Sequence, residues 1–142
     1  MELDKIYTEL IMEHNKSGHN KRILDNATSV ERGHNPNCGD DFTIQLEVEG
    51  DIVKDAAFEG VGCAISTASA SILMDMIKGE KIEDVKNVVD SFLKMIKKEK
   101  LSDEERVSLG DSTFLENISN MPARVKCATL AWNGVKVLIE KK

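Results

Sequence analysis

Residues 42–71, FTIQLEVEGDIVKDAAFEGVGCAISTASAS, contain the pattern that decides the fold. Apolar and polar side chains alternate from Phe42 to Val48, which predicts a β-strand with one buried face. The dipeptide Gly50-Asp51 predicts a turn, and Ile52–Phe58 predicts the second strand of a hairpin. The segment from Ala64 onward is rich in Ala and Ser and predicts a helix that follows the hairpin directly.

The sequence on either side predicts further helices and irregular segments. The expected helices are Leu3–Lys16, Ala64–Lys78, Ile82–Lys98 and Pro122–Ile139. The expected irregular or weakly β-like segments are a short β-like piece at Ala27–Val30, a loop at Asn35–Asp40, and a polar connector with room for one short helix at Leu101–Asn120. We therefore expect an α+β domain, in which a small antiparallel sheet of about three strands has helices packed on one face.

Length and composition are those of one globular domain covering residues 1–142. The chain is 41% hydrophobic and 31% charged, and its net charge of −6 argues against nucleic-acid binding, which needs clustered Lys and Arg. The N-terminus is polar and no apolar run reaches membrane-spanning length, so we expect no membrane association and a cytoplasmic location. Thiols stay reduced there, so no disulfide is expected among the three cysteines.

The first candidate for chemistry is Cys38-Gly39-Asp40 in the predicted loop. Gly39 permits tight backbone conformations, so the thiol of Cys38 and the carboxylate of Asp40 can turn toward one point. A thiolate and a carboxylate suit a divalent metal ion. This tripeptide alone is a weak signal, because short sequences of this kind recur by chance.

The other two cysteines lie where thiolates are favoured. Cys63 directly precedes the predicted helix, whose free N–H groups and dipole stabilise negative charge. Cys127 follows Arg124 and Lys126, whose charges would lower its pKa and offset negative charge at a metal. A plainer interpretation remains for each, a buried free cysteine that packs as a small hydrophobic residue.

Cys38, Asp40, Cys63 and Cys127 together provide three sulfurs and one oxygen, which complete the tetrahedral shell that zinc prefers. A zinc ion with four protein ligands is normally structural. Thiolates also hold iron–sulfur clusters. The residues by themselves leave these options open.

Other residue types that carry chemistry in many proteins are given plainer roles here. His34 is expected to be an exposed loop histidine, and His14 and His19 are expected to face solvent. The small residues of Ser66–Ser71 predict close helix packing rather than a nucleophilic serine, and Trp132 is expected in the core.

Three ordered motifs resemble the signatures of a known family. NPNCGD at 35–40, FEGVGCAISTASAS at 58–71 and RVKCATLAW at 124–132 are similar to the SufU branch of the IscU/NifU-like proteins of iron–sulfur cluster assembly. The spacing of the three cysteines is also similar to that of this family, with 25 residues from Cys38 to Cys63 and 64 from Cys63 to Cys127. The longer interval matches a SufU-type insertion, expected within residues 82–120.

The resemblance implies a zinc-dependent sulfur acceptor, that is, a sulfurtransferase with an IscU/NifU-like fold. A SufS-like cysteine desulfurase, which uses pyridoxal phosphate, would deliver persulfide sulfur to Cys38, and the protein would pass it to downstream cluster-assembly proteins. Arg124 is the implied contact with the desulfurase. The implied zinc ligands are Cys38, Asp40, Cys63 and Cys127.

Two alternatives use the same four residues. One is a scaffold that assembles a [2Fe–2S] cluster or binds iron, and the other is a structural zinc module that binds a partner. Two departures weaken the scaffold hypothesis. Lys126 stands where scaffolds of the family carry a histidine, and Met121–Val125 (MPARV) stands where they carry the LPPVK segment held by an Hsp70-type chaperone.

Overall fold

The computed structural model describes residues 9, 12, 20–35 and 39–140, without the side chains of residues 111 and 114. The helix predicted over Leu3–Lys16 lies outside this part of the chain, apart from Glu9 and Met12, which are helical. Cys38 also lies outside the described residues. No helix within the described ranges combines the length and the apolar run that a membrane crossing requires.

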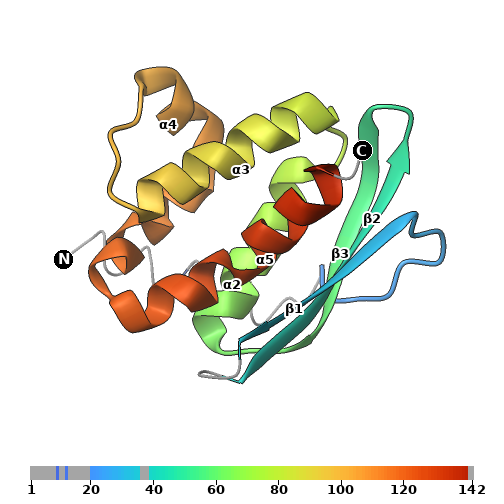
Figure 1. The fold of residues 1–142 in the computed structure, drawn as a ribbon, viewed down its shortest axis with the longest axis horizontal. Coiled ribbons are helices and arrows are strands. Elements are labelled where there is room, and N and C mark those ends of the chain that lie inside the picture. Colours follow the sequence, from blue (N-terminus) through green and yellow to red (C-terminus); the bar gives the residue numbers. More distant parts are fainter. Residues whose placement is uncertain (1–8, 10–11, 13–19, 36–38, 141–142) are drawn as a thin grey trace.

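A three-stranded antiparallel sheet forms one side of the molecule, as predicted (Figure 1). The strands lie in the order β1 (Ser29–Asn35), β2 (Asp40–Glu49) and β3 (Ile52–Val61). The predicted alternation holds on β2, where Phe42, Ile44 and Leu46 are all buried. The hairpin of β2 and β3 therefore presents one apolar face to the rest of the chain.

β1 lies later in the chain than the sequence predicts. The prediction is a short piece at Ala27–Val30, whereas the strand runs to Asn35, which pairs with Asp40. Both of these residues belong to the predicted loop, so that loop prediction is wrong at its two ends. β1 is an edge strand that carries Glu31 and Arg32, so it lacks apolar alternation, and pairing with β2 defines its length.

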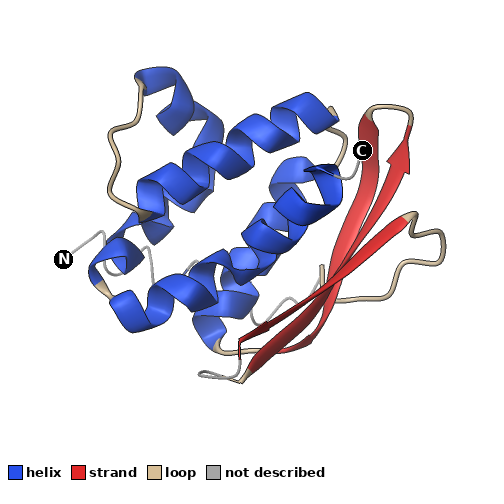
Figure 2. Cartoon of the chain, in the orientation of Figure 1, coloured by secondary structure: helices blue, strands red, loops and turns tan. Residues whose placement is uncertain are grey.

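The helices of the described chain cover one face of the sheet, which confirms the predicted α+β architecture (Figure 2). They are α2 (Ala64–Ile77), α3 (Ile82–Ile96), α4 (Asp103–Leu109), the 3-10 helix η1 (Gly110–Asn120) and α5 (Pro122–Glu140). The ends of α2, α3 and α5 agree with the predicted helices to within two residues.

The connector Leu101–Asn120 holds more regular structure than predicted. α4 and η1 together occupy it, whereas one short helix at most is predicted. α4 begins with a capping box, in which the Ser102 hydroxyl accepts a hydrogen bond from the N–H of Glu105 and the Glu105 carboxylate accepts one from the N–H of Ser102. The Ser-x-x-Glu spacing of this box is visible in the sequence and is the signal that could have placed α4.

α5 lies at the centre of the helical layer, in contact with α2, α3 and β1 (Figure 1). Trp132 of α5 is fully buried, as predicted, and stacks on Phe92 of α3 with ring centroids 3.7 Å apart and ring planes 4° apart. Aromatic side chains bury large areas and dominate core packing. α5 is therefore held firmly at the position from which it presents Cys127.

Candidate metal centre

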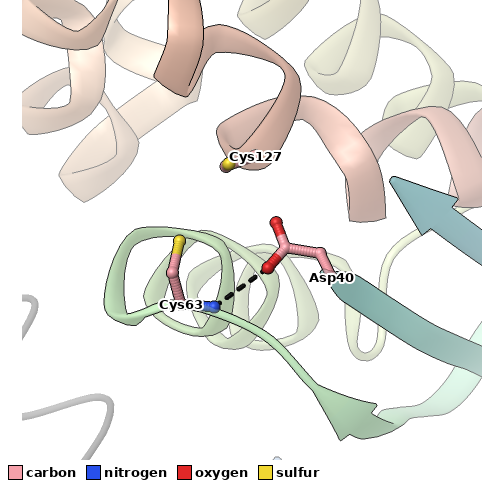
Figure 3. Close-up of side chains that lie close together, drawn as sticks. All are labelled: Asp40, Cys63 and Cys127. Carbon is pink, nitrogen blue, oxygen red and sulfur yellow. Dashed lines mark hydrogen bonds between the residues drawn. The ribbon is translucent and has the colours of Figure 1, made fainter. Parts of the chain in front are cut away.

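Asp40, Cys63 and Cys127 meet at one end of the sheet, where their ligand atoms all lie within 4.8 Å of one another (Figure 3). They come from three elements: Asp40 is the first residue of β2, Cys63 is the residue before α2, and Cys127 lies in the second turn of α5. These three residues form the Asp-Cys-Cys site. The two sulfur atoms and the carboxylate face a common space in Figure 3.

Asp40 is fully buried although it is a carboxylate. Its Oδ1 accepts a hydrogen bond of 2.9 Å from the backbone N–H of Cys63. The strand ladder holds its backbone, because Asp40 pairs with Asn35 of β1. A carboxylate is costly to bury unless it is hydrogen-bonded or bound to a metal, so its position beside two thiols is typical of a ligand.

Two glycines allow the backbone of Cys63 to reach Asp40. Gly60 has φ = +118°, and a Cβ atom at this position would lie 2.0 Å from the carbonyl oxygen of Asp41. At Gly62 a Cβ atom would lie 2.5 Å from a ring carbon of Phe42. A side chain at Gly60 would push β3 away from β2, and one at Gly62 would displace the Phe42 ring or Ser66. Either change would alter the position of Cys63 relative to Asp40.

Cys63 is the N-cap of α2, as its place before the predicted helix suggests. Its Sγ accepts a hydrogen bond of 3.5 Å from the N–H of Ser66 and lies 3.3 Å from Ser66 Oγ. Burial is the largest influence on the pKa of Cys63 and raises it, and the Asp40 carboxylate raises it as well. Hydrogen bonds from Ser66 and from the N–H of Ile65 lower the pKa more, so it lies below the usual cysteine value.

Cys127 is buried in α5, with 1% of its surface exposed. Arg124 and Lys126, which the sequence assigns to charge compensation, are both exposed in the first turns of the same helix. Neither forms an ion pair with a described residue. Two cations that pair with none of the described carboxylates therefore lie within three residues of Cys127 in the sequence.

The Asp-Cys-Cys site fits three of the four positions around a zinc ion. In a tetrahedral site with Zn–S bonds of about 2.3 Å, two ligand sulfurs lie about 3.8 Å apart. The observed limit of 4.8 Å therefore requires a contraction of only about 1 Å on binding. Two thiols and a carboxylate also match the ligand types that zinc prefers.

The remaining predicted residues are distributed as follows. Cys38, the fourth ligand in the sequence hypothesis, lies outside the described residues and stays a prediction. His34 is exposed, as predicted, but it lies in β1 opposite Asp41 rather than in a loop. Asp41 points away from the Asp-Cys-Cys site and forms a two-pronged ion pair with Arg32, at 2.9 and 2.6 Å.

Ser66 is a polar neighbour of the site that the sequence analysis missed. It is 1% exposed, and its hydroxyl also lies within hydrogen-bonding distance of the carbonyl oxygen of Cys63, at 3.1 Å. From the sequence alone, this serine is expected only to allow close helix packing. The available signal was its position three residues after a cysteine N-cap, where a backbone N–H bonds the cap side chain.

The sequence matches the model of a protein family described as the NifU-like N-terminal domain over residues 6–140. It is 40% identical over 140 residues to a Bacillus subtilis protein named zinc-dependent sulfurtransferase SufU, covering 99% of this chain and 93% of the relative. It is also 40% identical over 136 residues to a Thermotoga maritima protein named iron–sulfur cluster assembly scaffold protein IscU, covering 96% of this chain and 94% of the relative.

A solved structure shows the same fold. It is a crystal structure from Fervidobacterium islandicum, described as an iron–sulfur cluster assembly scaffold protein for the SUF system. It superposes with a TM-score of 0.88 at 31% sequence identity and covers 95% of this chain and 97% of that chain. Sequence and backbone similarity therefore extend over nearly the whole molecule.

Proposed function

The chain belongs to the NifU-like N-terminal domain family, and from this premise we propose that it acts in iron–sulfur cluster assembly as a zinc-dependent sulfurtransferase. One observation carries the proposal, namely that two thiols and a carboxylate from three separate elements converge within 4.8 Å. A similar protein of Bacillus subtilis is named for this activity.

In this proposal Asp40, Cys63 and Cys127 hold a zinc ion together with Cys38. Cys38 is two residues before Asp40 in the sequence, and Asp40 is the first residue of β2. Three thiolates and one carboxylate around Zn²⁺ leave an excess of negative charge. The exposed cations Arg124 and Lys126 supply the compensating field.

Cys38 is the proposed sulfur acceptor. Bound zinc would keep the cysteine ligands deprotonated at neutral pH. The sulfur of Cys38 attacks the terminal sulfur of a persulfide on the desulfurase cysteine. A new S–S bond forms on Cys38 while the S–S bond on the desulfurase breaks, and the desulfurase cysteine leaves as a thiolate. The reaction needs no external oxidant or reductant, because the transferred sulfur keeps its oxidation state.

The described residues support the choice of Cys38 over the other two cysteines. Cys63 is held by the cap of α2 and by Asp40, and Cys127 is buried within α5. Cys38 is joined to the sheet through Gly39, whose φ of +73° is open to glycine and rare for other residues. The cysteine that accepts sulfur is therefore proposed to be the one next to Gly39, rather than either of the two held at α2 and α5.

The proposed partners are a SufS-like, pyridoxal-phosphate-dependent cysteine desulfurase upstream and cluster-assembly proteins downstream. Arg124 is proposed to contact the desulfurase, because it is exposed in the helix that presents Cys127. We further propose that residues 1–142 form one domain, and that α3, α4 and η1 correspond to the SufU-type insertion within 82–120.

A second candidate function is a [2Fe–2S] scaffold on the same residues. The similar protein of Thermotoga maritima carries a scaffold name, and thiolates bind iron–sulfur clusters as well as zinc. This alternative assigns the same ligands and differs in the cofactor, iron or a cluster in place of zinc.

The deciding experiment measures metal content and sulfur transfer on anaerobically purified protein. We expect a colourless protein with one zinc per chain, which accepts ³⁵S from a cysteine desulfurase and stimulates its release of alanine. Cys38→Ala should accept no sulfur while it keeps its far-UV circular dichroism. His34→Ala, an exposed change on β1, is the matched control and should transfer sulfur normally.

Two outcomes contradict the proposal. Normal sulfur acceptance by Cys38→Ala would overturn the assignment of the acceptor. A brown protein whose cluster passes to an apo-ferredoxin, without sulfur acceptance from the desulfurase, would favour the scaffold.

A further inference from the structure

Ser69 of α2 forms a buried hydrogen-bonded bridge to α5. Its Oγ donates a hydrogen bond of 2.6 Å to the carbonyl oxygen of Ala128 and accepts one of 2.8 Å from the indole Nε1–H of Trp132. All three residues are fully buried. The hydroxyl therefore has both a donor and an acceptor partner on one neighbouring helix.

The bridge lies close to the two helical ligands of the Asp-Cys-Cys site. Ser69 is six residues after Cys63, less than two turns along α2, and Ala128 directly follows Cys127. The hydrogen bonds thus join the two helices near the ends that carry the sulfurs.

We propose that Ser69 is a positioning residue for the metal centre, which sets the separation of Cys63 and Cys127 by fixing α5 on α2. This inference rests on the proposed metal site and adds a residue that is not one of its proposed ligands.

Ser69 is flanked in α2 by small, fully buried alanines, Ala68 and Ala70. Small apolar side chains make no directional contact that would define the register of two helices. A hydrogen bond defines the register, because a shift along the helix axis would leave the buried indole N–H without its acceptor.

The indole is itself held in place by a second contact, on the face of its ring. Trp132 stacks on Phe92 of α3 at 3.7 Å, with the two rings nearly parallel. The donor that engages Ser69 therefore cannot turn toward another acceptor without disrupting the stack. The positioning of α5 on α2 consequently includes a contribution from α3.

The test uses Co²⁺ as a visible probe of the tetrahedral site in four variants. Ser69→Ala removes the bridge. Trp132→Phe removes the indole donor but keeps the bond from Ser69 to Ala128. The double variant removes the bridge without leaving an unpaired indole N–H. Ser91→Ala is the matched control, since Ser91 is also a buried serine but bonds Glu105 of α4, at 3.3 Å.

Cobalt affinity, the energies of the visible bands and the melting temperature are measured for each. We expect Ser69→Ala and the double variant to bind Co²⁺ about tenfold more weakly, with shifted bands, which is the usual size of effect for residues that orient ligands. The double variant should recover part of the melting temperature lost in Ser69→Ala without recovering the parent bands. Trp132→Phe should shift the bands less than Ser69→Ala does, because the bond from Ser69 to Ala128 remains. Ser91→Ala should keep the bands of the parent.

The proposal is overturned if Ser69→Ala keeps the affinity and bands of the parent. It is also overturned if the shifts of the bands in all variants simply follow the changes in melting temperature, since Ser69 would then act only through stability.

If the parent protein binds neither zinc nor cobalt, the proposed function is wrong. The positioning role is then decided without metal, by the ¹⁵N amide shift of Cys63, which should change in Ser69→Ala and not in Ser91→Ala. An unchanged shift would reject it.

Discussion

The backbone N–H of Cys63 donates a hydrogen bond of 2.9 Å to the carboxylate of Asp40. This bond joins the start of α2 to the start of β2, so two of the proposed ligands are held together by the protein itself. A metal that binds there meets a site whose geometry is largely prepared, and less of its binding free energy is used to order the chain. Substitution of Asp40 should therefore affect both metal binding and folding.

Asp40→Asn and Asp40→Ala separate these two roles. Asn keeps an acceptor for the N–H of Cys63 but loses the charged ligand oxygen, so zinc affinity should fall at least about tenfold with little change in stability. Ala removes the acceptor as well, and the free energy of unfolding should fall by about 1–3 kcal/mol. Chelator competition and urea unfolding of the metal-free proteins measure the two effects. Equal stability of the two variants would contradict the role of the hydrogen bond.

Gly60→Ala should unfold the site end of the sheet. The new Cβ would lie 2.0 Å from a backbone oxygen of Asp41, at a φ of +118° that other residues avoid. We expect a loss of more than about 2 kcal/mol in the free energy of unfolding. Gly50→Ala is the control, because Gly50 also has a positive φ of +64° but has open space around its Cβ position. Gly50→Ala should lower the free energy of unfolding by about 1 kcal/mol. A similar decrease for both variants would show that the structure accommodates the Cβ atom at Gly60 with little loss of stability.

Stability should fall as the pH drops from about 5 to 2, partly through Glu105. Hydrogen bonds from the N–H of Ser102 and from Lys94 lower the pKa of Glu105 to about 2. The folded state therefore favours the charged form, and this contribution is complete above the unfolded pKa of about 4.3 and is lost as the pH falls toward 2.

Melting temperature against pH, for the parent and Glu105→Gln, tests this linkage. Glu105→Gln should show a shallower decline below pH 5 than the parent. Glu104→Gln is the control, since Glu104 forms no ion pair with a described residue and should decline like the parent. Identical curves for all three proteins would remove Glu105 from the acid response.

Zinc should raise the melting temperature, because the complete site exists only in the folded chain. At free zinc about 100-fold above Kd the gain is about 2.7 kcal/mol, which corresponds to a rise of about 5–10 °C for a domain of this size. Differential scanning calorimetry with zinc and with a chelator measures it. Mg²⁺, which takes oxygen ligands and keeps its waters, should have no effect. A zinc-independent melting temperature would argue against an ordered metal centre.

Arg124→Glu should weaken binding to the desulfurase more strongly than it weakens binding of zinc. Reversal of an exposed charge at an interface acts on association and on its salt dependence. With the variant and the parent loaded with zinc to the same level, we expect less stimulation of the desulfurase by the variant at low salt. Lys86→Glu on α3 makes the same change of charge at a position 38 residues before Arg124 in the sequence, and it should leave the stimulation of the desulfurase unchanged. Equal effects of both variants would indicate general electrostatics rather than a contact at Arg124.

The elements with strong local patterns could be predicted from the sequence. The hairpin follows from alternation between Phe42 and Val48, and α3 from apolar residues at helical spacing. β1 and η1 were harder, for different reasons. β1 is an edge strand whose hydrogen bonds come from β2, and η1 is a polar 3-10 segment of low apolar periodicity. The local sequence therefore contains no periodic pattern that would predict either β1 or η1.

The candidate ligands could be named from the sequence, because thiols and a carboxylate are ligand types that zinc prefers. Their meeting point could not, since Asp40 and Cys127 are 87 residues apart and their separation depends on how α5 packs on α2 and the sheet. The hydrogen bonds that hold this packing, from Ser69 and Trp132, are also invisible locally. Serine in a small-residue helix has no pattern that distinguishes a bridge from simple packing.

The sequence by itself therefore determined the secondary structure of the hairpin and the main helices and the chemical identity of the candidate ligands. These depend on side-chain periodicity and residue type, which are local properties of the chain. Only the tertiary structure decided that the carboxylate of Asp40 and the thiols of Cys63 and Cys127 share one space. That arrangement comes from long-range packing and from hydrogen bonds between elements, whose free energy appears only when distant segments fold against one another.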